Sequence, residues 1–220
     1  MHVSANSPVI RLANGWRYFR HRGLMPAIQT IIDRYLYRSH RCIIDHCALA
    51  GPPVDDHVGD IVLRLATPSD LDRLDEFERY GRGSIQRAYV TKDNDWLFVA
   101  CHGARIVATR RVSRVVRDGL ISRVVQLRQG QLWAADVFCL PEYRNQGIGR
   151  HLALFGDRFL ASLGYEERFG HVAVSNTPSL RLSRHKGNQP VYYVSYFRVL
   201  FWERLFVSRD IPRRFWAGLE

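Results

Sequence analysis

The residues with the clearest chemical potential lie in one loop, Arg144-Asn145-Gln146-Gly147-Ile148-Gly149-Arg150. Gly147 and Gly149 carry no side chain that would keep a ligand away from their N–H groups. The apolar periodicity that follows predicts a helix, so these N–H groups would lie at its N-terminus, where unpaired donors and the helix dipole attract an anion. With Arg144 and Arg150 beside them, the stretch predicts a site for a diphosphate rather than a lone carboxylate.

The spacing narrows the choice of ligand. No Gly-Lys-Ser/Thr sequence is present, which argues against a mononucleotide P-loop, and Leu152 stands where a dinucleotide fingerprint would need its third glycine. An ordinary strand-to-helix turn with glycines for packing is the remaining alternative.

What is left is Arg144-x-x-Gly147-x-Gly149 after a strand that ends in Leu-Pro-Glu-Tyr, and a second block, Asn176-x-x-Ser179-x-x-Leu182. Together they resemble the signature of the GNAT superfamily of N-acetyltransferases. The resemblance covers roughly residues 58–200 and is strongest at 132–164. It implies an α/β (α+β) fold, a mixed twisted sheet flanked by helices, here with an N-terminal helical extension. It also implies acetyl-CoA as co-substrate and no metal.

The resemblance further implies how the co-substrate is bound. The loop would hold its pyrophosphate, and the strand before the loop would part from its neighbour to pair with the pantetheine arm. Asn176 would hydrogen-bond the same arm. The residues expected to bind acetyl-CoA are Phe138, Cys139, Leu140, Arg144, Asn145, Gln146, Gly147, Ile148, Gly149, Arg150 and Asn176.

Acyl transfer to an amine needs a base for the ammonium and a proton for the departing thiolate. Asp136, at a position that is acidic in many members of the family, is the candidate base or ammonium anchor; a structural salt bridge with an arginine is the alternative. Ser183 occupies the place of the family's usual tyrosine acid. Ser183, His185 and Tyr193 are therefore the candidate acids.

The expected function is transfer of an acetyl group to a primary amine of a small molecule, such as an amino sugar, by direct attack in a ternary complex. Three alternatives stay open: a longer acyl donor, a non-catalytic acyl-CoA-binding or regulatory domain, and a basic nucleic-acid binder. The last has the charge but no recognition motif, so we expect no nucleic-acid partner.

Composition agrees with a folded domain of ordinary type. Of the 220 residues, 46% are hydrophobic, and the net charge of +11 rests almost wholly on arginine. Such a surface attracts polyanions, but the charge alone does not identify a particular partner. Four scattered cysteines favour free thiols in a reducing compartment, and their spacing gives no zinc framework. With no apolar run long enough to span a bilayer, we expect a cytoplasmic protein, with a homodimer among its assemblies.

The chain divides into residues 1–57, a basic amphipathic helical extension and linker, and residues 58–220, the acetyltransferase domain. Past Pro26, apolar residues recur at helical spacing from Ile28 to Leu36, with arginines as far as Arg41 on the polar side, and with the basic aromatic stretch from Trp16 they predict one amphipathic helix or two short ones. This segment would either dock on the domain or lie on an anionic membrane. Residues 42–57 are expected to form a connecting strand and linker. The core is expected to begin near Asp60. Strands are expected at 61–66, 96–101, 104–112, 131–140, 170–174 and 191–201, and helices from Thr67, at 148–163 and from Asn176.

Overall fold

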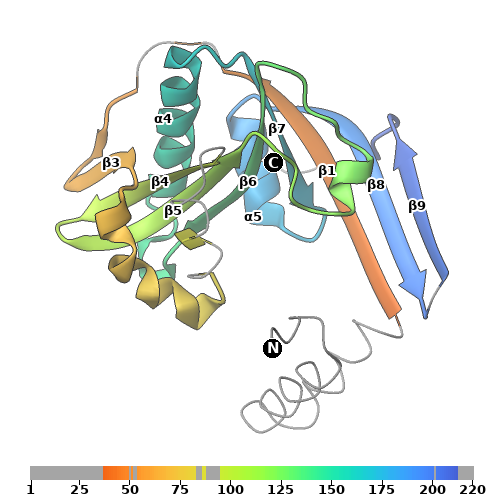
Figure 1. Ribbon diagram of the computed structural model, residues 1–220, viewed down its shortest axis with the longest axis horizontal. Helices are drawn as coiled ribbons and strands as arrows, with labels where there is room; N and C mark the ends of the chain where they lie inside the picture. Colours follow the sequence, from red (N-terminus) through yellow and green to blue (C-terminus); the bar gives the residue numbers. More distant parts are fainter. Residues whose placement is uncertain are drawn as a thin grey trace, which may run out of the picture. The chain divides into compact units, whose positions relative to one another are not determined.

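The computed structural model describes residues 37–49, 51, 54–82, 86–87, 95–200 and 202–212 (Figure 1). The expected N-terminal helix, as far as residue 36, lies outside the described residues. Its contact with a membrane stays a prediction. The described residues fall into two compact units, one within 42–193 and 208–212, the other within 37–41 and 194–207. The larger unit holds the candidate site.

The larger unit is built on a mixed sheet with the strand order β2-β3-β4-β5-β6-β7-β1-β8. Neighbouring strands pair antiparallel from β2 to β6 and between β7 and β1, whereas β6 and β7 run parallel. The strands are β1 (Tyr37–Ala48), β2 (His57–Val58), β3 (Ile61–Leu65), β4 (Asp95–His102), β5 (Arg105–Ser113), β6 (Gln131–Cys139), β7 (Glu167–Ala173) and β8 (Gln189–Val199). This is the expected GNAT arrangement.

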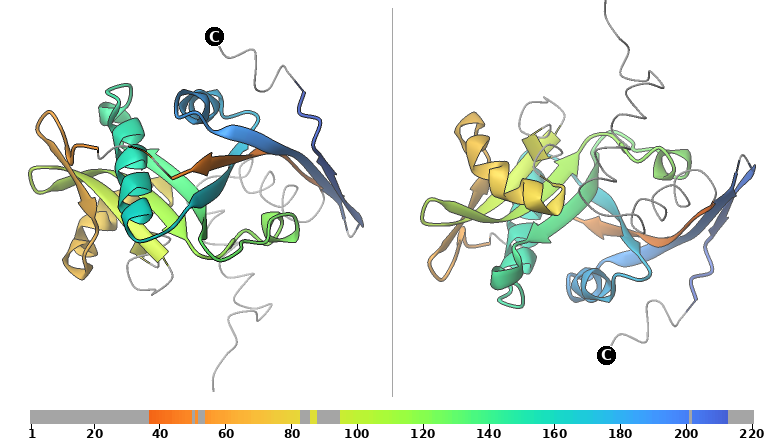
Figure 2. Two further views of the ribbon diagram at one scale, coloured as in Figure 1. Left: turned by 90° about the horizontal axis from the view of Figure 1, so that it is seen from above. Right: turned by 90° about the horizontal axis from the view of Figure 1, so that it is seen from below.

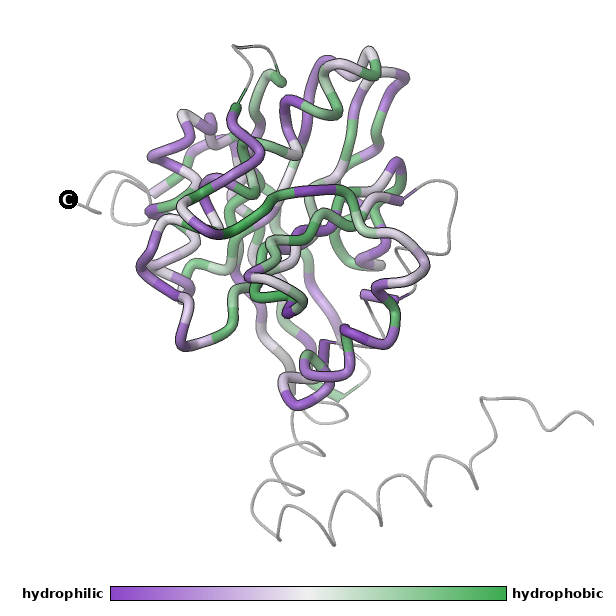
Figure 3. The backbone as a smooth tube through the Cα atoms, turned by 90° about the vertical axis from the view of Figure 1, so that its left-hand side faces the viewer, coloured by the Kyte–Doolittle hydropathy of each residue, from purple (hydrophilic) through white to green (hydrophobic). Residues whose placement is uncertain are grey.

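Helices cover both faces of this sheet (Figures 1 and 2). They are the α-helices α4 (Ile148–Ser162) and α5 (Thr177–His185) and the 3₁₀ helices η2 (Pro68–Asp70), η3 (Asp72–Tyr80), η4 (Ile121–Arg123) and η5 (Pro141–Tyr143). Side chains alternate between the faces along β4, so Phe98 joins the core under α4 and Leu97 joins Phe77 under η3. Figure 3 shows the hydrophobic stretches following the central strands, with hydrophilic residues at many of the turns.

The smaller unit contains, among the described residues, the first residues of β1, the second half of β8 and strand β9 (Trp202–Ser208). β9 follows β8 in the sheet order. Phe197 stacks on Phe206 with ring centroids 6.0 Å apart. The aromatic and β-branched composition of 191–201 therefore predicted strands correctly, although the segment continues into a second strand.

The region before Asp60 departs in part from expectation: the strand expected within 42–57 is present, but it begins earlier, at Tyr37. Residues 37–41 form a strand where helical spacing predicted a helix, and the core begins earlier, because Cys42, Ile43 and Ile44 are fully buried. They are buried consecutively because β1 lies inside the sheet, paired with β7 from Cys42↔Ala173 to Ala48↔Glu167. Sequence periodicity alone does not separate such a strand from a buried helix.

The other expected elements are present, with one change of type. The segment after Thr67 forms 3₁₀ rather than α-helical turns. This helical segment ends at Gly81, whose φ of 67° lies in the left-handed region. Thr67 and Asp70 cap each other's backbone N–H groups at its start. Residues 124–127, rich in apolar side chains, follow η4 without forming a strand.

The cap at Asp70 yields a stability prediction. The carboxylate is buried and accepts hydrogen bonds from Arg64 at 2.6 and 2.7 Å and from the Thr67 N–H at 2.8 Å. The Arg64 hydrogen bonds, with those of Thr67, lower the pKa of Asp70 to about 2. Asp70→Asn should therefore cost at most about 2 kcal/mol of unfolding free energy at pH 7.

Because the pKa is lowered, this stabilisation is complete above about pH 4 and is lost as pH falls toward 2. Urea unfolding of the parent and the variant between pH 2 and 7 measures it. Asp72→Asn, an exposed residue of η3, is the matched control and should change little. A deficit of Asp70→Asn that stayed constant down to pH 2 would contradict the charge-based explanation.

Candidate active site

Strands β6 and β7 separate part-way along their length (Figure 1). They pair only from Gln131↔Glu167 to Ala134↔Gly170. Beyond that point β6 stays paired with β5 as far as Cys139↔Ala108, and β7 stays paired with β1 as far as Ala173↔Cys42. The separation begins where the β5–β6 register shifts, so that Ala135 has no partner between Ala134↔Val112 and Asp136↔Arg111. The expected parting of the two strands is present.

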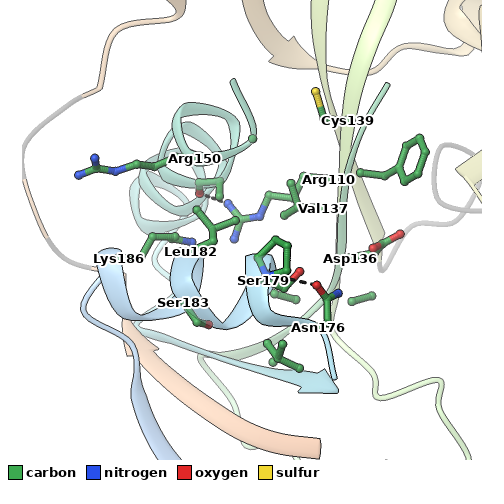
Figure 4. A pocket seen from close by; sticks show the side chains of 18 of the residues that line it. Arg110, Asp136, Val137, Cys139, Arg150, Asn176, Ser179, Leu182, Ser183 and Lys186 are labelled. Atoms are coloured by element: carbon green, nitrogen blue, oxygen red, sulfur yellow. Dashed lines mark hydrogen bonds between the residues drawn. The ribbon is translucent and has the colours of Figure 1, made fainter. Parts of the chain in front are cut away.

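A cavity of about 1010 Å³ occupies this opening, bounded by β6, β7, the glycine loop, α4 and α5 (Figure 4). Of the residues expected to bind acetyl-CoA, those that line it are Phe138, Cys139, Arg144, Asn145, Gly147, Ile148, Gly149, Arg150 and Asn176. Leu140 and Gln146 do not line it. The structure thus gathers two distant sequence blocks around one cavity.

The glycine loop forms the N-terminus of α4. Gly147 is the N-cap with φ 77°, and its carbonyl accepts the first helical bonds from Arg150 N–H at 2.9 Å and His151 N–H at 3.0 Å. The N–H groups of Ile148 and Gly149 precede those bonds and have no acceptor within the helix. A Cβ at Gly149 would lie 3.5 Å from Val137 Cγ1, so this turn lies directly against β6. Exposed Arg144 and Arg150 flank it.

The backbone of β6 presents different residues to the opening than the sequence indicated. The N–H of Leu140 already donates to the carbonyl of Val107 at 2.9 Å, and Leu140 is fully buried. Because hydrogen-bonded positions alternate along an antiparallel pair, Phe138 also faces β5, and Val137 and Cys139 direct their peptide groups toward β7. Val137 was missed; only the strand alternation counted from Leu140 could have found it.

Asn176 is the N-cap of α5, as its sequence context predicted. Its Oδ1 accepts a hydrogen bond from the Ser179 N–H at 3.2 Å. Its Nδ2 makes no hydrogen bond to any described residue, and the side chain lines the cavity (Figure 4). The cap therefore holds an amide donor at the cavity wall.

Asp136 lines the cavity but is held in ion pairs. Its Oδ2 accepts hydrogen bonds from Arg82 and, at 3.2 Å, from Arg111, and its side chain is 18% exposed. Phe138, two residues along the same face, contacts Phe77 of η3. Asp136 therefore lies on the η3 side of the sheet, and the salt-bridge alternative describes its contacts.

The three candidate acids differ in position. Ser183 is buried and lines the cavity, and its hydroxyl donates to Asp45 of β1. The Asn188 amide donates to both partners, at 2.8 Å to Asp45 and 2.8 Å to Ser183. His185 is exposed and Tyr193 half-buried, and neither lines the cavity. Of the three, only Ser183 lies where it could act as the acid, and its hydroxyl proton is already hydrogen-bonded to Asp45.

Beside this group lies a buried charge network that the sequence reading missed. Asp157 of α4 accepts hydrogen bonds from Arg110 and, at 2.9 Å, from Arg168 Nε, and Lys186 Nζ lies 2.9 Å from its other oxygen. All four side chains are at most 5% exposed. Arg168 also donates to Asn188 at 2.8 Å, which joins the two groups. The only signal was a charged residue, Arg110, inside an apolar strand.

The electrostatics of this network follow from its charges. Burial alone would raise the pKa of Asp157, but the positive charges of Arg110, Arg168 and Lys186 outweigh it and hold the pKa well below its usual range. Burial and the charge of Arg168 lower the pKa of Lys186 to about 7, against the opposing attraction of Asp157. Lys186 and its neighbours Arg110 and Arg168 line the cavity.

Comparison with known families agrees with this geometry. Residues 63–187, more than half of the chain, match the acetyltransferase (GNAT) family. The chain belongs to this family. It is an N-acetyltransferase, and its β1, with Asp45, lies outside the matched residues. No curated protein sequence matches the enzyme.

Solved structures with TM-scores above 0.5 show the same fold at low sequence identity. A GCN5-related N-acetyltransferase from Sphaerobacter thermophilus is 18% identical, with 87% of this chain and 67% of that chain covered and a TM-score of 0.51. A Drosophila protein is 14% identical, with 83% and 57% covered and a TM-score of 0.54, so the acetyltransferase spans little more than half of that protein. An aminoglycoside acetyltransferase from a soil metagenome, in complex with sisomicin, is 16% identical, with 58% and 88% covered and a TM-score of 0.46.

Two further features concern ligands and membranes. In the part of the chain that the structure describes, no three His, Cys, Asp or Glu side chains are grouped so as to hold a metal ion. No helix among those residues has the length and apolarity to cross a bilayer. The expectations of a cytoplasmic location and a homodimer stay predictions.

The network predicts unequal costs for its members. Asp157→Asn would leave the buried Arg110 and Arg168 guanidinium groups, together with Lys186, without their shared carboxylate, and it should cost about 3–5 kcal/mol of unfolding free energy. Lys186→Met would leave Arg110 and Arg168 facing Asp157 and Asp45, a balanced set, and should cost clearly less. Urea unfolding at pH 7 compares the two. Equal losses would show that charge balance does not govern this part of the core.

Proposed function

We propose that this N-acetyltransferase moves an acetyl group from acetyl-CoA to a primary amine of a small molecule, by direct attack within a ternary complex. The observation that carries the proposal is the meeting of a glycine-lined helix N-terminus with two parted strands in one cavity. A diphosphate fits the first, and an amide-containing arm fits the second.

The loop residues suit paired phosphates. The N–H groups of Ile148 and Gly149 point out of the start of α4, and the glycines leave their approach open. Arg144 and Arg150 add fixed positive charge on either side. Arg144 is already positioned, because its Nε donates to the carbonyl of Cys139 at 3.1 Å. These groups would hold the pyrophosphate of the co-substrate.

The parted strands suit the pantetheine arm. Peptide groups of Val137 and Cys139 face the opening, and the Asn176 amide stands across it on α5. An arm with two amides can add to a strand edge as a further strand would. Such pairing fixes the acyl end with little freedom, which favours attack by a correctly placed amine.

The acceptor side is the η3 face. The thioester supplies an activated acyl carbon and a thiolate leaving group, and the protein must hold the amine and handle two protons. On that face Asp136 forms a charged cluster with Arg82 and Arg111, which are ion-paired to it. We assign Asp136 to orienting these arginines and anchoring the ammonium rather than to free general-base action, because its bonded oxygen already has two cationic partners.

The phosphate cradle is tested by charge removal. The double variant Arg144→Ala, Arg150→Ala should bind acetyl-CoA about 10- to 100-fold more weakly by isothermal titration, because two charge-assisted contacts are lost. Acetyl-pantetheine, which lacks the phosphates, should bind parent and variant equally. Arg128→Ala, an exposed arginine outside the cavity, is the matched control. A loss of affinity shared by acetyl-pantetheine would point to a disturbed fold.

The transfer reaction is tested by thiol release from acetyl-CoA across a panel of small amines, with amino sugars included. Asp136→Asn should keep acetyl-CoA affinity within about twofold while lowering kcat/KM for the best amine about tenfold or more, since the carboxylate is lost while the positive charges of Arg82 and Arg111 remain. Asp60→Asn, exposed and outside the cavity, should match the parent. Thiol release with no amine of the panel, despite tight acetyl-CoA binding, would count against a small-molecule acceptor.

A further inference from the structure

The proposed transfer leaves one proton unassigned, and the following inference rests on that proposed function. A thiolate departing from acetyl-CoA needs a proton, and the family's usual tyrosine is replaced here by Ser183. The Ser183 hydroxyl donates to Asp45, and both accept from Asn188. A hydroxyl fixed in this way cannot give its proton to sulfur without breaking the bond to a buried carboxylate.

Lys186 is placed to take over this role. It is the C-cap of α5, three residues after Ser183, so the two lie on the same side of the helix end. Both line the cavity, as does Leu182 of the same helix (Figure 4). Its Nζ is fixed by Asp157 at 2.9 Å, and its side chain is only 5% exposed. A buried ammonium carries two further N–H donors beyond that contact.

We propose that the ammonium group of Lys186 supplies the proton to the departing thiolate, in place of the missing tyrosine. The amine forms the new C–N bond, the C–S bond breaks, and its electron pair leaves with sulfur. The Lys186 ammonium gives one proton to that sulfur and becomes a neutral amine. A proton released from the acceptor nitrogen, through solvent, restores the ammonium and closes the balance.

The surroundings of Lys186 suit an acid of this strength. The charged groups that face it are Asp157 from α4, Arg110 from β5 and Arg168 from β7, with Asp45 of β1 joined through Asn188. Burial first, and then the positive charge of Arg168, lower the pKa of Lys186 to about 7. A simple thiol such as that of cysteine has a pKa of about 8.5, so transfer from this ammonium to a thiolate is downhill.

A spectroscopic titration tests the assignment without turnover. Lys92 and Lys186 are the only lysines, so protein labelled with ¹⁵N-lysine gives two side-chain nitrogen signals, and Lys186→Met identifies them. The Lys186 signal should titrate near pH 7, and its midpoint should move when coenzyme A with a free thiol is added. Adenosine 3′,5′-diphosphate, which lacks the thiol arm, should leave it unchanged. A Lys186 signal indifferent to coenzyme A would overturn the proposal.

Kinetics give the second readout, with the best amine from the thiol-release panel. For the parent, kcat should fall as pH rises through about 7, because the Lys186 ammonium loses its proton. Lys186→Met should lower kcat about 10- to 100-fold at pH 6.5, and its kcat should no longer show this alkaline limb, the fall above pH 7. Lys186→Arg keeps the charge but cannot release a proton at this pH, so it should resemble Lys186→Met. Lys92→Met is the matched control.

The outcomes separate the two proposals. If acetyl-CoA neither binds nor reacts with the parent, the proposed function fails. If the parent reacts and Lys186→Arg keeps full kcat with the same alkaline limb, only the assignment of Lys186 fails, and its charge is purely structural. Unfolding curves identify any variant whose loss of rate reflects loss of fold, and for such a variant the ¹⁵N titration of the parent decides.

Discussion

The constraint on which the rest of the structure depends is the divergence of β6 and β7 after Ala134 and Gly170. Each strand leaves its parallel neighbour while it keeps an antiparallel partner on its other side. β5 and β1 satisfy the peptide groups on the outer edges, whereas the peptide groups on the inner edges face the cavity. These inner-edge groups suit the amide-containing ligand proposed above. Because β1 precedes the residues that match the family, the cavity draws on sequence beyond that core.

The closed end of the opening sets the chemistry. There Arg110 of β5 and Arg168 of β7 meet Asp157 of α4 in buried ion pairs. Buried ion pairs seldom stabilise a protein more than well-packed apolar residues would. This polar wall, in which the pKa of Lys186 is about 7, thus fits the proposed proton transfer better than a purely stabilising role. The polar wall also disfavours a long apolar acyl chain at this end of the cavity.

The two faces of the sheet divide the work. On the α4 side lie the glycine loop, the Asn176 amide and the buried network; on the η3 side lie Asp136 and its arginines. Residues from both sides line the cavity, which suits the proposed approach of a thioester and an amine from opposite faces. This separation explains why Asp136 and Ser183, both singled out from the sequence, occupy such different environments.

Features that rest on local chemistry can be predicted from the amino-acid sequence. The glycine loop, the helix from Ile148, the Asn176 cap and the strand before the loop follow from residues within one or two turns of each other. Other contacts could be found only in the folded protein. These are the ion pairs of Asp136, the hydrogen bond from Ser183 to Asp45, which lies 138 positions away, and the pairing of Arg110 and Lys186 with Asp157. These contacts join strands and helices far apart in the chain, and no periodicity records which charged side chain will meet which once the strands are paired.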